Sequence, residues 1–270
     1  MLIRGKKSMK VESGIQGFDE ITGGGVPRSA AIALIGQAGA GKELLARHLA
    51  WNLLNQGSKV LYASITQAAD ELRHNMLSYG WDVTPFEENN QFRIVDVFTH
   101  ALDKMTGDIE ERKLMLSEDF DPNGDIASIT YHKELYDLKI LNNVGIKFFP
   151  LKSLVMNRSE RRFAVFDTFS PILLTNTKDV FQMIHSLKFA TRLVKVTGIG
   201  IVHSGVHDDQ TMATIRSLAD AVIEVEKVEK GSGSAIKITK YPGKHKKGPF
   251  PIEETESGVN IIPIEMPDLM

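Results

Sequence analysis

Short apolar runs alternate with amphipathic segments along most of the chain. The apolar runs that have the length of a strand are residues 30–35, 59–65, 92–98, 163–167 and 198–203. After the first run, Leu45, Leu49 and Leu53 recur every four residues, which predicts a helix over 43–56 with one apolar face. Strands that are apolar throughout, with helices between them, are typical of a parallel sheet that is covered on both faces.

The same analysis predicts two further helices and a different C-terminal pattern. Residues 68–79 predict a helix that Gly80 ends, and 178–196 predict a long helix capped by Asn176 or Thr177. The segments with the pattern of hairpin strands are 221–228, 235–241 and 259–265. We therefore expect an α/β fold, with a mostly parallel central sheet flanked by helices and an antiparallel hairpin extension at the C-terminal end.

The chain is predicted to form a single domain over residues 1–270. Residues 1–28 lead in to the first core strand, 29–229 form the core, and 230–270 form the hairpin and tail. Inside the core, residues 103–160 carry charges and short apolar runs, and they predict nothing more specific than helices and loops.

Composition excludes several classes of protein. Of the 270 residues, 42% are hydrophobic and 24% are charged, which is ordinary for a globular chain and unlike a disordered or fibrous one. The absence of cysteine excludes a disulfide framework, a thiolate metal site and a cysteine nucleophile. A net charge of −2 argues against a globally basic nucleic-acid binder. Charges interrupt the first residues, and every apolar run is too short to span a membrane, so we expect a cytoplasmic protein.

A phosphate-loop motif lies between the strand at 30–35 and the helix at 43–56. Its residues, which match G-x-x-x-x-G-K, are Gly36, Gln37, Ala38, Gly39, Ala40, Gly41, Lys42 and Glu43. The glycines let successive backbone N–H groups point at one anion, the helix adds its positive end, and Lys42 supplies a charge for the terminal phosphates. We predict that the loop binds ATP or another nucleotide; the alternative is a strand-to-helix turn without a ligand.

Glu43 departs from the motif, which has Ser or Thr at this position to bind Mg²⁺. A carboxylate can also ligate Mg²⁺, so Glu43 is a candidate metal ligand. It also repels phosphates, by about 3 kcal/mol for charges about 5 Å apart at an effective dielectric constant of about 20. Alternatively, Glu43 pairs with Lys42 or the helix N-terminus and occupies the site as an internal anion. Each interpretation predicts altered binding of Mg²⁺-nucleotide.

Asp167 is the second acidic candidate, at the end of the strand 163–167. An aspartate there fits the outer-sphere partner of Mg²⁺ in a phosphate-loop protein. The alternative is an aspartate that caps the next turn. Because the phosphate loop favours the first interpretation, Asp167 is predicted to join the nucleotide site and, with Glu43, the Mg²⁺ site.

Segments outside the phosphate loop add a resemblance to the KaiC-type branch of the RecA-like P-loop ATPases. The segments that carry the resemblance are 13–28, 57–64, 80–82, 217–224, 240–245 and 251–259. The first holds a glycine triplet and Pro27-Arg28 just ahead of the first core strand. The resemblance covers 11–98 and 163–264. It implies a RecA-like fold, self-association into a ring, and nucleotide held between neighbouring subunits.

The resemblance also implies catalytic parts that this chain has altered. The acidic pair that usually follows the second core strand is replaced by Thr66-Gln67, and the Lys-x-Arg pair of the terminal hairpin is Lys240 followed by Pro242. Neither Thr nor Gln accepts a proton effectively at neutral pH, although Gln67 could still orient a water. Lys240 remains a candidate contact to a neighbour's nucleotide, but the missing arginine finger costs orders of magnitude in rate.

We therefore expect a degenerate ATPase that binds nucleotide, turns it over weakly or not at all, and works by association with itself or with a partner protein or peptide. One alternative is a working Mg²⁺-ATPase that uses Glu43 as metal ligand and Asp70 or Glu71 as base. Another is a nucleic-acid-binding RecA relative that uses the lysine-rich segment between Lys227 and Lys247, although contact between subunits ranks first for these lysines.

Two histidines follow the strand at 198–203. In the implied fold, His203 and His207 lie near the terminal phosphate, where they could sense phosphate or hold a metal. Their spacing alone does not make a zinc site, and we favour a polar loop with hydrogen-bonded histidines.

Overall fold

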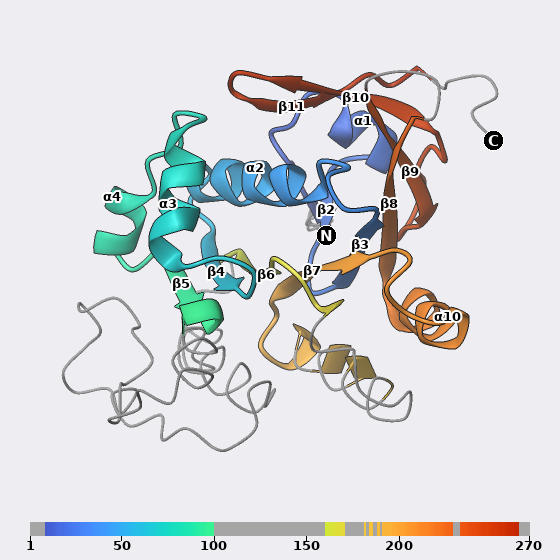
Figure 1. Ribbon diagram of the computed structural model, residues 1–270, viewed down its shortest axis with the longest axis horizontal. Helices are drawn as coiled ribbons and strands as arrows, with labels where there is room; N and C mark the ends of the chain where they lie inside the picture. Colours follow the sequence, from blue (N-terminus) through green and yellow to red (C-terminus); the bar gives the residue numbers. More distant parts are fainter. Residues whose placement is uncertain are drawn as a thin grey trace, which may run out of the picture.

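The computed structural model describes residues 9–99, 160–170, 181, 184–185, 188–189, 191–228 and 233–264. Their strands form a nine-stranded sheet with the order β11-β10-β9-β8-β3-β7-β6-β4-β5. A separate two-stranded pair joins β1 (Lys10–Val11) to β2 (Val26–Pro27) in the segment ahead of the first core strand. Figure 1 shows the strands of the sheet running through the middle of the molecule.

Six neighbouring strands of the described sheet are parallel. They are β5 (Phe92–Asp96), β4 (Lys59–Ser64), β6 (Arg162–Phe166), β7 (Thr197–His203), β3 (Ala31–Gly36) and β8 (Ala221–Lys227). The central strand β3 is buried at every position after the first. This near-continuous burial is the reason that the sequence shows apolar runs rather than alternation.

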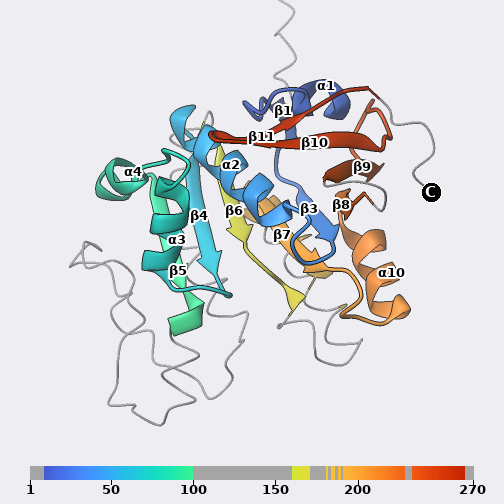
Figure 2. The same ribbon diagram turned by 45° about the horizontal axis from the view of Figure 1, so that its top comes forward.

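The C-terminal strands extend the sheet in the antiparallel direction. They are β9 (Ser234–Lys240), β10 (Phe250–Thr255) and β11 (Gly258–Ile261). Strand β9 pairs with β8, β10 with β9, and β11 with β10 through a tight hairpin. The predicted antiparallel extension is therefore confirmed, and Figure 2 shows it crossing above the start of the phosphate-loop helix.

Five helices have defined bounds in the described residues. They are α1 (Phe18–Thr22), α2 (Lys42–Asn55), α3 (Ala69–Leu77), α4 (Thr84–Glu88) and α10 (Asp209–Leu218). Residues 181, 184–185, 188–189 and 191–193 are also helical and lie between β6 and β7 in the sequence.

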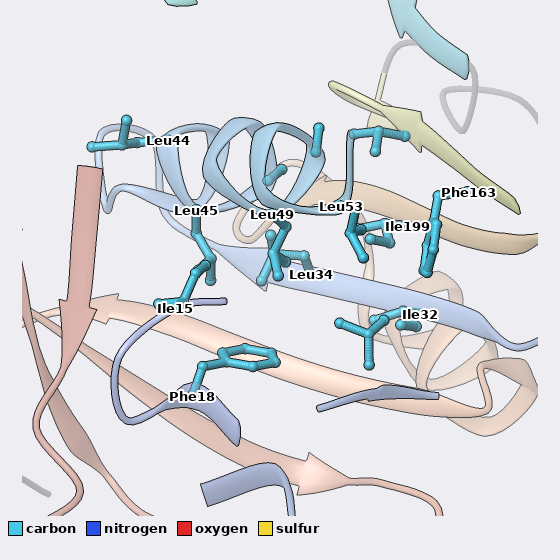
Figure 3. Close-up of a cluster of buried hydrophobic side chains, with 14 of the residues drawn as sticks. Ile15, Phe18, Ile32, Leu34, Leu44, Leu45, Leu49, Leu53, Phe163 and Ile199 are labelled. Atoms are coloured by element: carbon cyan, nitrogen blue, oxygen red, sulfur yellow. The ribbon is translucent and has the colours of Figure 1, made fainter. Parts of the chain in front are cut away.

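The two faces of β3 supply two separate cores. Ile32 and Leu34 belong to the large cluster that includes the apolar face of α2, as Figure 3 shows. Ala33 and Ile35 belong to a smaller cluster with residues of α10. Because successive side chains of a strand point to opposite faces, one apolar run fills both cores.

The apolar face predicted for the first helix is buried. Leu45, Leu49 and Leu53 of α2 are 0%, 3% and 0% exposed, and they pack over the sheet (Figure 3). Burying each leucine stabilises the fold by about 1.5–3 kcal/mol. This packing fixes α2 over β3 and so fixes the position of the loop that joins them.

Strand order determines where a ligand site can form. Strand β3 lies between β7 and β8, whereas the next core strand in the sequence, β4, is separated from β3 by the two strands β7 and β6. The chain after β3 must therefore cross over the sheet before it continues. In parallel α/β sheets, ligands bind at the carboxyl ends of the strands at such a point.

Most predicted elements are confirmed, and some bounds were wrong. Strand β5 ends at Asp96 rather than 98, because 97–99 turn into a helix. The last strand ends at Ile261 rather than 265, just before Pro263, which has no N–H to donate. The short helices α1 and α4 and the longer α10 were not predicted.

Some predictions fall outside the described residues. Most of the segment 103–160 and much of the helix 178–196 belong to this group, as does the tail beyond 264. The division into lead-in, core and hairpin stays a prediction. Within the described ranges, no helix combines the length and apolar character that crossing a bilayer requires.

Candidate functional site

The phosphate loop joins the end of β3 to the start of α2, as the motif requires. Gly39 and Gly41 have φ of 68° and 88°, in the left-handed region that glycine adopts readily. Gly36 is needed for space, since a Cβ atom there would lie 2.0 Å from the backbone oxygen of Val225 on β8. The backbone conformation of the loop and its close approach to β8 therefore require glycine at these three positions.

The start of α2 can accept an anion. The first N–H groups of any helix lack partners within the helix, and they carry the positive end of its dipole. The N-cap is Gly41, which has no side chain to satisfy them. A phosphate group would supply the missing acceptors, so the loop fits the phosphates of a nucleotide.

Lys42 is engaged by its own loop. Its side chain is 0% exposed, and its Nζ donates to the backbone oxygen of Gln37 at 2.9 Å. The same Nζ lies 2.8 Å from Oε1 of Glu43. The lysine that the motif assigns to the terminal phosphates is therefore already paired with an internal carboxylate.

Glu43 stands between Lys42 and the end of β7. His203 is level with Gly36 in the strand register, and its Nε2 lies 4.0 Å from Oε1 of Glu43. Burial is the main cause that lowers the pKa of His203, and the positive charge of Lys42 lowers it further. The negative charge of Glu43 acts to raise this pKa. The imidazole is therefore neutral near pH 7, and its buried Nδ1 has no hydrogen-bond partner among the described residues.

His207, the second histidine of this loop, is hydrogen-bonded. Its Nε2 lies 3.1 Å from Oγ of Ser170, which also accepts the backbone N–H of His203 at 2.9 Å. No group of three or more His, Asp or Glu side chains in the described ranges could hold a metal ion. His207 is hydrogen-bonded as the polar-loop interpretation expects, whereas Nδ1 of His203 has no partner among the described residues, and the interpretation stays a prediction.

Asp167 follows β6 and binds the segment after β4. Its Oδ1 accepts the N–H of Ile65 at 2.9 Å, and its Oδ2 accepts both the N–H and the hydroxyl of Thr66, at 3.2 and 2.8 Å. Burial raises the pKa of Asp167, while these hydrogen bonds act to lower it. Asp167 thus has a structural role in joining two strand ends.

The residues present do not fit Mg²⁺ as the motif would hold it. Residue 43 has no hydroxyl, its carboxylate is paired with Lys42, and both oxygens of Asp167 already accept hydrogen bonds. Assignment of Mg²⁺ to Glu43 and Asp167 stays a prediction, and the pairing of these carboxylates does not favour it.

Gln67, the candidate for orienting a water, is held from two sides. Its Oε1 accepts from Nδ2 of Asn75 on α3 at 2.7 Å, and its backbone oxygen accepts from the hydroxyl of Ser64 at 2.6 Å. The alternative base Asp70 is 96% exposed on its side chain and paired with Arg73. Neither residue is arranged to take a proton at the loop.

Lys240 lies near the amino-terminal ends of the parallel strands, whereas the phosphate loop lies at their carboxyl-terminal ends. It pairs in register with Val222 near the start of β8. Its Nζ donates to the backbone oxygens of Ser217 and Arg216, at 2.8 and 3.3 Å, at the end of α10. A chain therefore does not bring its own Lys240 to its own phosphate loop.

Three residues near the site were not assigned to it from the sequence. Tyr62 on β4 has a fully buried hydroxyl without a hydrogen-bond partner in the described residues. Burial raises the pKa of Tyr62, the charge of Asp167 raises it further, and Arg47 on α2 opposes them. Lys227, at the end of β8, places its Nζ 3.2 Å from where a Cβ of Gly39 would be. A second lysine thus reaches the phosphate loop.

Comparison with known proteins supports the architecture. The family model for the KaiC ATPase matches residues 11–122. The crystal structure of a KaiC-like protein from Pyrococcus horikoshii has the same fold, with a TM-score of 0.69 at 19% identity over 94% of this chain and 99% of the other.

Curated relatives give the same picture. Over 95 residues, the chain is 38% identical to a UPF0273 protein of Pyrococcus horikoshii, and over 120 residues it is 32% identical to one of Thermotoga maritima. These alignments cover 35% and 44% of this chain but only 38% and 48% of the relatives. A UPF0273 protein of Aeropyrum pernix is 25% identical over 94% of both chains. With the family model, these matches show that the chain is similar to KaiC-like ATPases in sequence and has the fold of a KaiC-like protein.

Proposed function

We propose that this protein binds nucleotide at the phosphate loop, hydrolyses it slowly or not at all, and acts through association with copies of itself or with a partner protein. The observation that carries the proposal is the ion pair between Lys42 and Glu43 inside the loop. The family implies nucleotide binding. In this chain, however, the carboxylate of Glu43 neutralises the charge of Lys42, which the motif assigns to the terminal phosphates.

The remaining catalytic parts support slow turnover. An attacking water needs a proton acceptor, and Thr66 and Gln67 stand at the position of the base. The Thr66 hydroxyl donates to Asp167, and the Gln67 side-chain oxygen accepts from Asn75, so both groups are already hydrogen-bonded. Pro242 stands where the family has its finger arginine, so no guanidinium from that position can stabilise charge in the transition state. Each part lowers the rate separately.

Self-association is supported by the position of Lys240. This lysine lies at the amino edge of the parallel strands, opposite the phosphate loop of its own chain. It can reach a nucleotide only if the nucleotide belongs to another copy. Sedimentation of the protein with and without nucleotide would measure this association.

Calorimetric titration of ATP, with and without Mg²⁺, tests the proposal. Glu43→Thr restores the hydroxyl of the motif and removes the internal anion, so it should raise affinity for Mg²⁺-ATP by about tenfold to a hundredfold. Lys42→Ala is the control and should abolish binding in both backgrounds. If wild-type protein releases phosphate at an ordinary rate for an ATPase, and Lys42→Ala stops it, the protein is a working enzyme and the proposal fails.

A further inference from the structure

The phosphate loop has opposite charges on its two sides. On the side of β7, the carboxylate of Glu43 lies between Lys42 and His203. On the side of β8, the ammonium of Lys227 lies beside Gly39. In phosphate loops, residue 43 would hold the metal that bridges the two terminal phosphates, whereas the backbone around Gly39 cradles the inner ones.

Lys227 reaches the loop because of strand register. Val225 is level with Gly36, so Lys227 stands two residues beyond the end of β3 and on the same face of the sheet as Val225. Val225 belongs to the core cluster beneath α2, which places the lysine on the side of the sheet where the loop turns into that helix. The cation is therefore positioned by the sheet itself.

A third phosphate would meet negative charge. A terminal phosphate would have to enter beside the Glu43 carboxylate, which already pairs with Lys42 and offsets its charge. His203 offers no compensating charge, since its imidazole is neutral near pH 7. The two inner phosphates, in contrast, would meet the helix N-terminus and Lys227.

We infer that the site selects nucleoside diphosphates over Mg²⁺-bound triphosphates, with Glu43 excluding the terminal phosphate and Lys227 binding the inner ones. This inference rests on the proposed nucleotide binding. It names a ligand class for the site, and it assigns a role to a lysine that lies outside the phosphate-loop motif.

The test is calorimetric titration of ADP, ATP and Mg²⁺-ATP into full-length protein. Wild-type protein should bind ADP about tenfold or more tightly than Mg²⁺-ATP, as expected for one unfavourable charge contact. The isosteric change Glu43→Gln should remove most of this preference by strengthening triphosphate binding. Lys227→Met should weaken ADP binding about tenfold, while Lys195→Met, at an exposed lysine just before β7 and outside the lysine-rich segment, should leave it unchanged.

The outcomes separate the inference from the proposed function. If wild-type protein binds Mg²⁺-ATP as tightly as ADP, or Glu43→Gln leaves the ratio unchanged, the selection is wrong although the nucleotide site stands. If neither nucleotide binds to wild-type, Glu43→Gln or Glu43→Thr protein, the proposed function fails and the inference fails with it. Circular dichroism of each variant confirms that it is folded.

Discussion

Helix α2 has two contrasting surroundings along its length. At its start, Lys42, Glu43 and Arg47 meet strand ends where two buried polar atoms, the hydroxyl of Tyr62 and Nε of Arg47, lack partners among the described residues. The next residue, His48, instead stacks on Trp81 with ring centroids 5.0 Å apart, and its Nδ1 accepts the N–H of Val259. The first region keeps buried polar atoms without partners among the described residues beside the phosphate loop, whereas the second is closed by packing.

The closed region joins three parts of the chain. Trp81 stacks in turn on Tyr79, with centroids 4.9 Å apart, and the Tyr79 hydroxyl donates to Glu254 on β10 at 2.7 Å. The C-terminal hairpin is thereby attached to the phosphate-loop helix. The comparison teaches that the packing around His48 and the proposed ligand binding at the charged start depend on different residues of one helix, so mutations in the two regions should have separable effects.

The largest effect should come from the packed middle of α2. Leu49→Ala removes a side chain that is 3% exposed and should destabilise the protein by about 2–5 kcal/mol. Urea unfolding measures this loss. The matched control Leu77→Ala, at a leucine that is 56% exposed, should change stability by less than about 0.5 kcal/mol. Equal losses in the two variants would contradict the packing described.

The hairpin attachment can be tested at Gly258. A Cβ there would lie 2.6 Å from Nδ1 of His48 and 2.8 Å from Trp81, so Gly258→Ala should cost about 1–3 kcal/mol and displace the hairpin. Gly57→Ala is the matched control, since Gly57 also has positive φ but has open space around it. Thermal unfolding and tryptophan fluorescence should change clearly more for the first variant than for the second.

The charged start of α2 should show the opposite balance of effects. Glu43→Gln removes the partner of the buried Lys42 and should lower stability by about 1 kcal/mol, because Glu43 is one-third exposed and solvent weakens the pair. The same variant should bind triphosphates more tightly. Unfolding measured with and without ATP tests both the loss of stability and the tighter binding of triphosphates. A variant that is more stable than wild-type protein without ligand would contradict a stabilising pair between Lys42 and Glu43.

The smallest effect should be a dependence on pH at His48. Burial lowers the pKa of His48, and its Nδ1 can accept the Val259 N–H only when unprotonated. Its stabilising contribution is therefore complete above the ordinary histidine pKa of about 6.5 and is lost as the pH falls through the lower folded value. Thermal unfolding from pH 7.5 to 5 should show a steeper loss of stability for wild-type protein than for His48→Gln. Equal pH dependence in the two proteins would show that His48 does not contribute to it.

The fold was largely predictable because its signals are local. The apolar runs, the phosphate-loop spacing and the leucines of α2 each specify an element within a few residues. Helix α10 was missed although a signal was present, since Asp208 caps it through the N–H of Thr211, and Met212 and Ile215 supply a buried face.

The site was predictable only where the motif covered it. The identity of residue 43 indicated that the metal position was altered, and pairing with Lys42 was one of the alternatives derived from it. The roles of Tyr62, Arg47 and Lys227 depend on which strands lie side by side. That order arises from crossovers, and no spacing along the chain encodes the approach of Lys227 to Gly39.

The position of Lys240 has a geometric consequence for assembly. If Lys240 of one copy meets the phosphate loop of another, as proposed, the copies can join only head to tail, because the two features lie at opposite ends of the parallel strands. Each added copy would then leave one of each exposed until the assembly closes on itself. An open string of such copies would keep growing, whereas a closed circle has no free end. The number of copies would then be set by the angle between successive molecules rather than by the strength of any single contact.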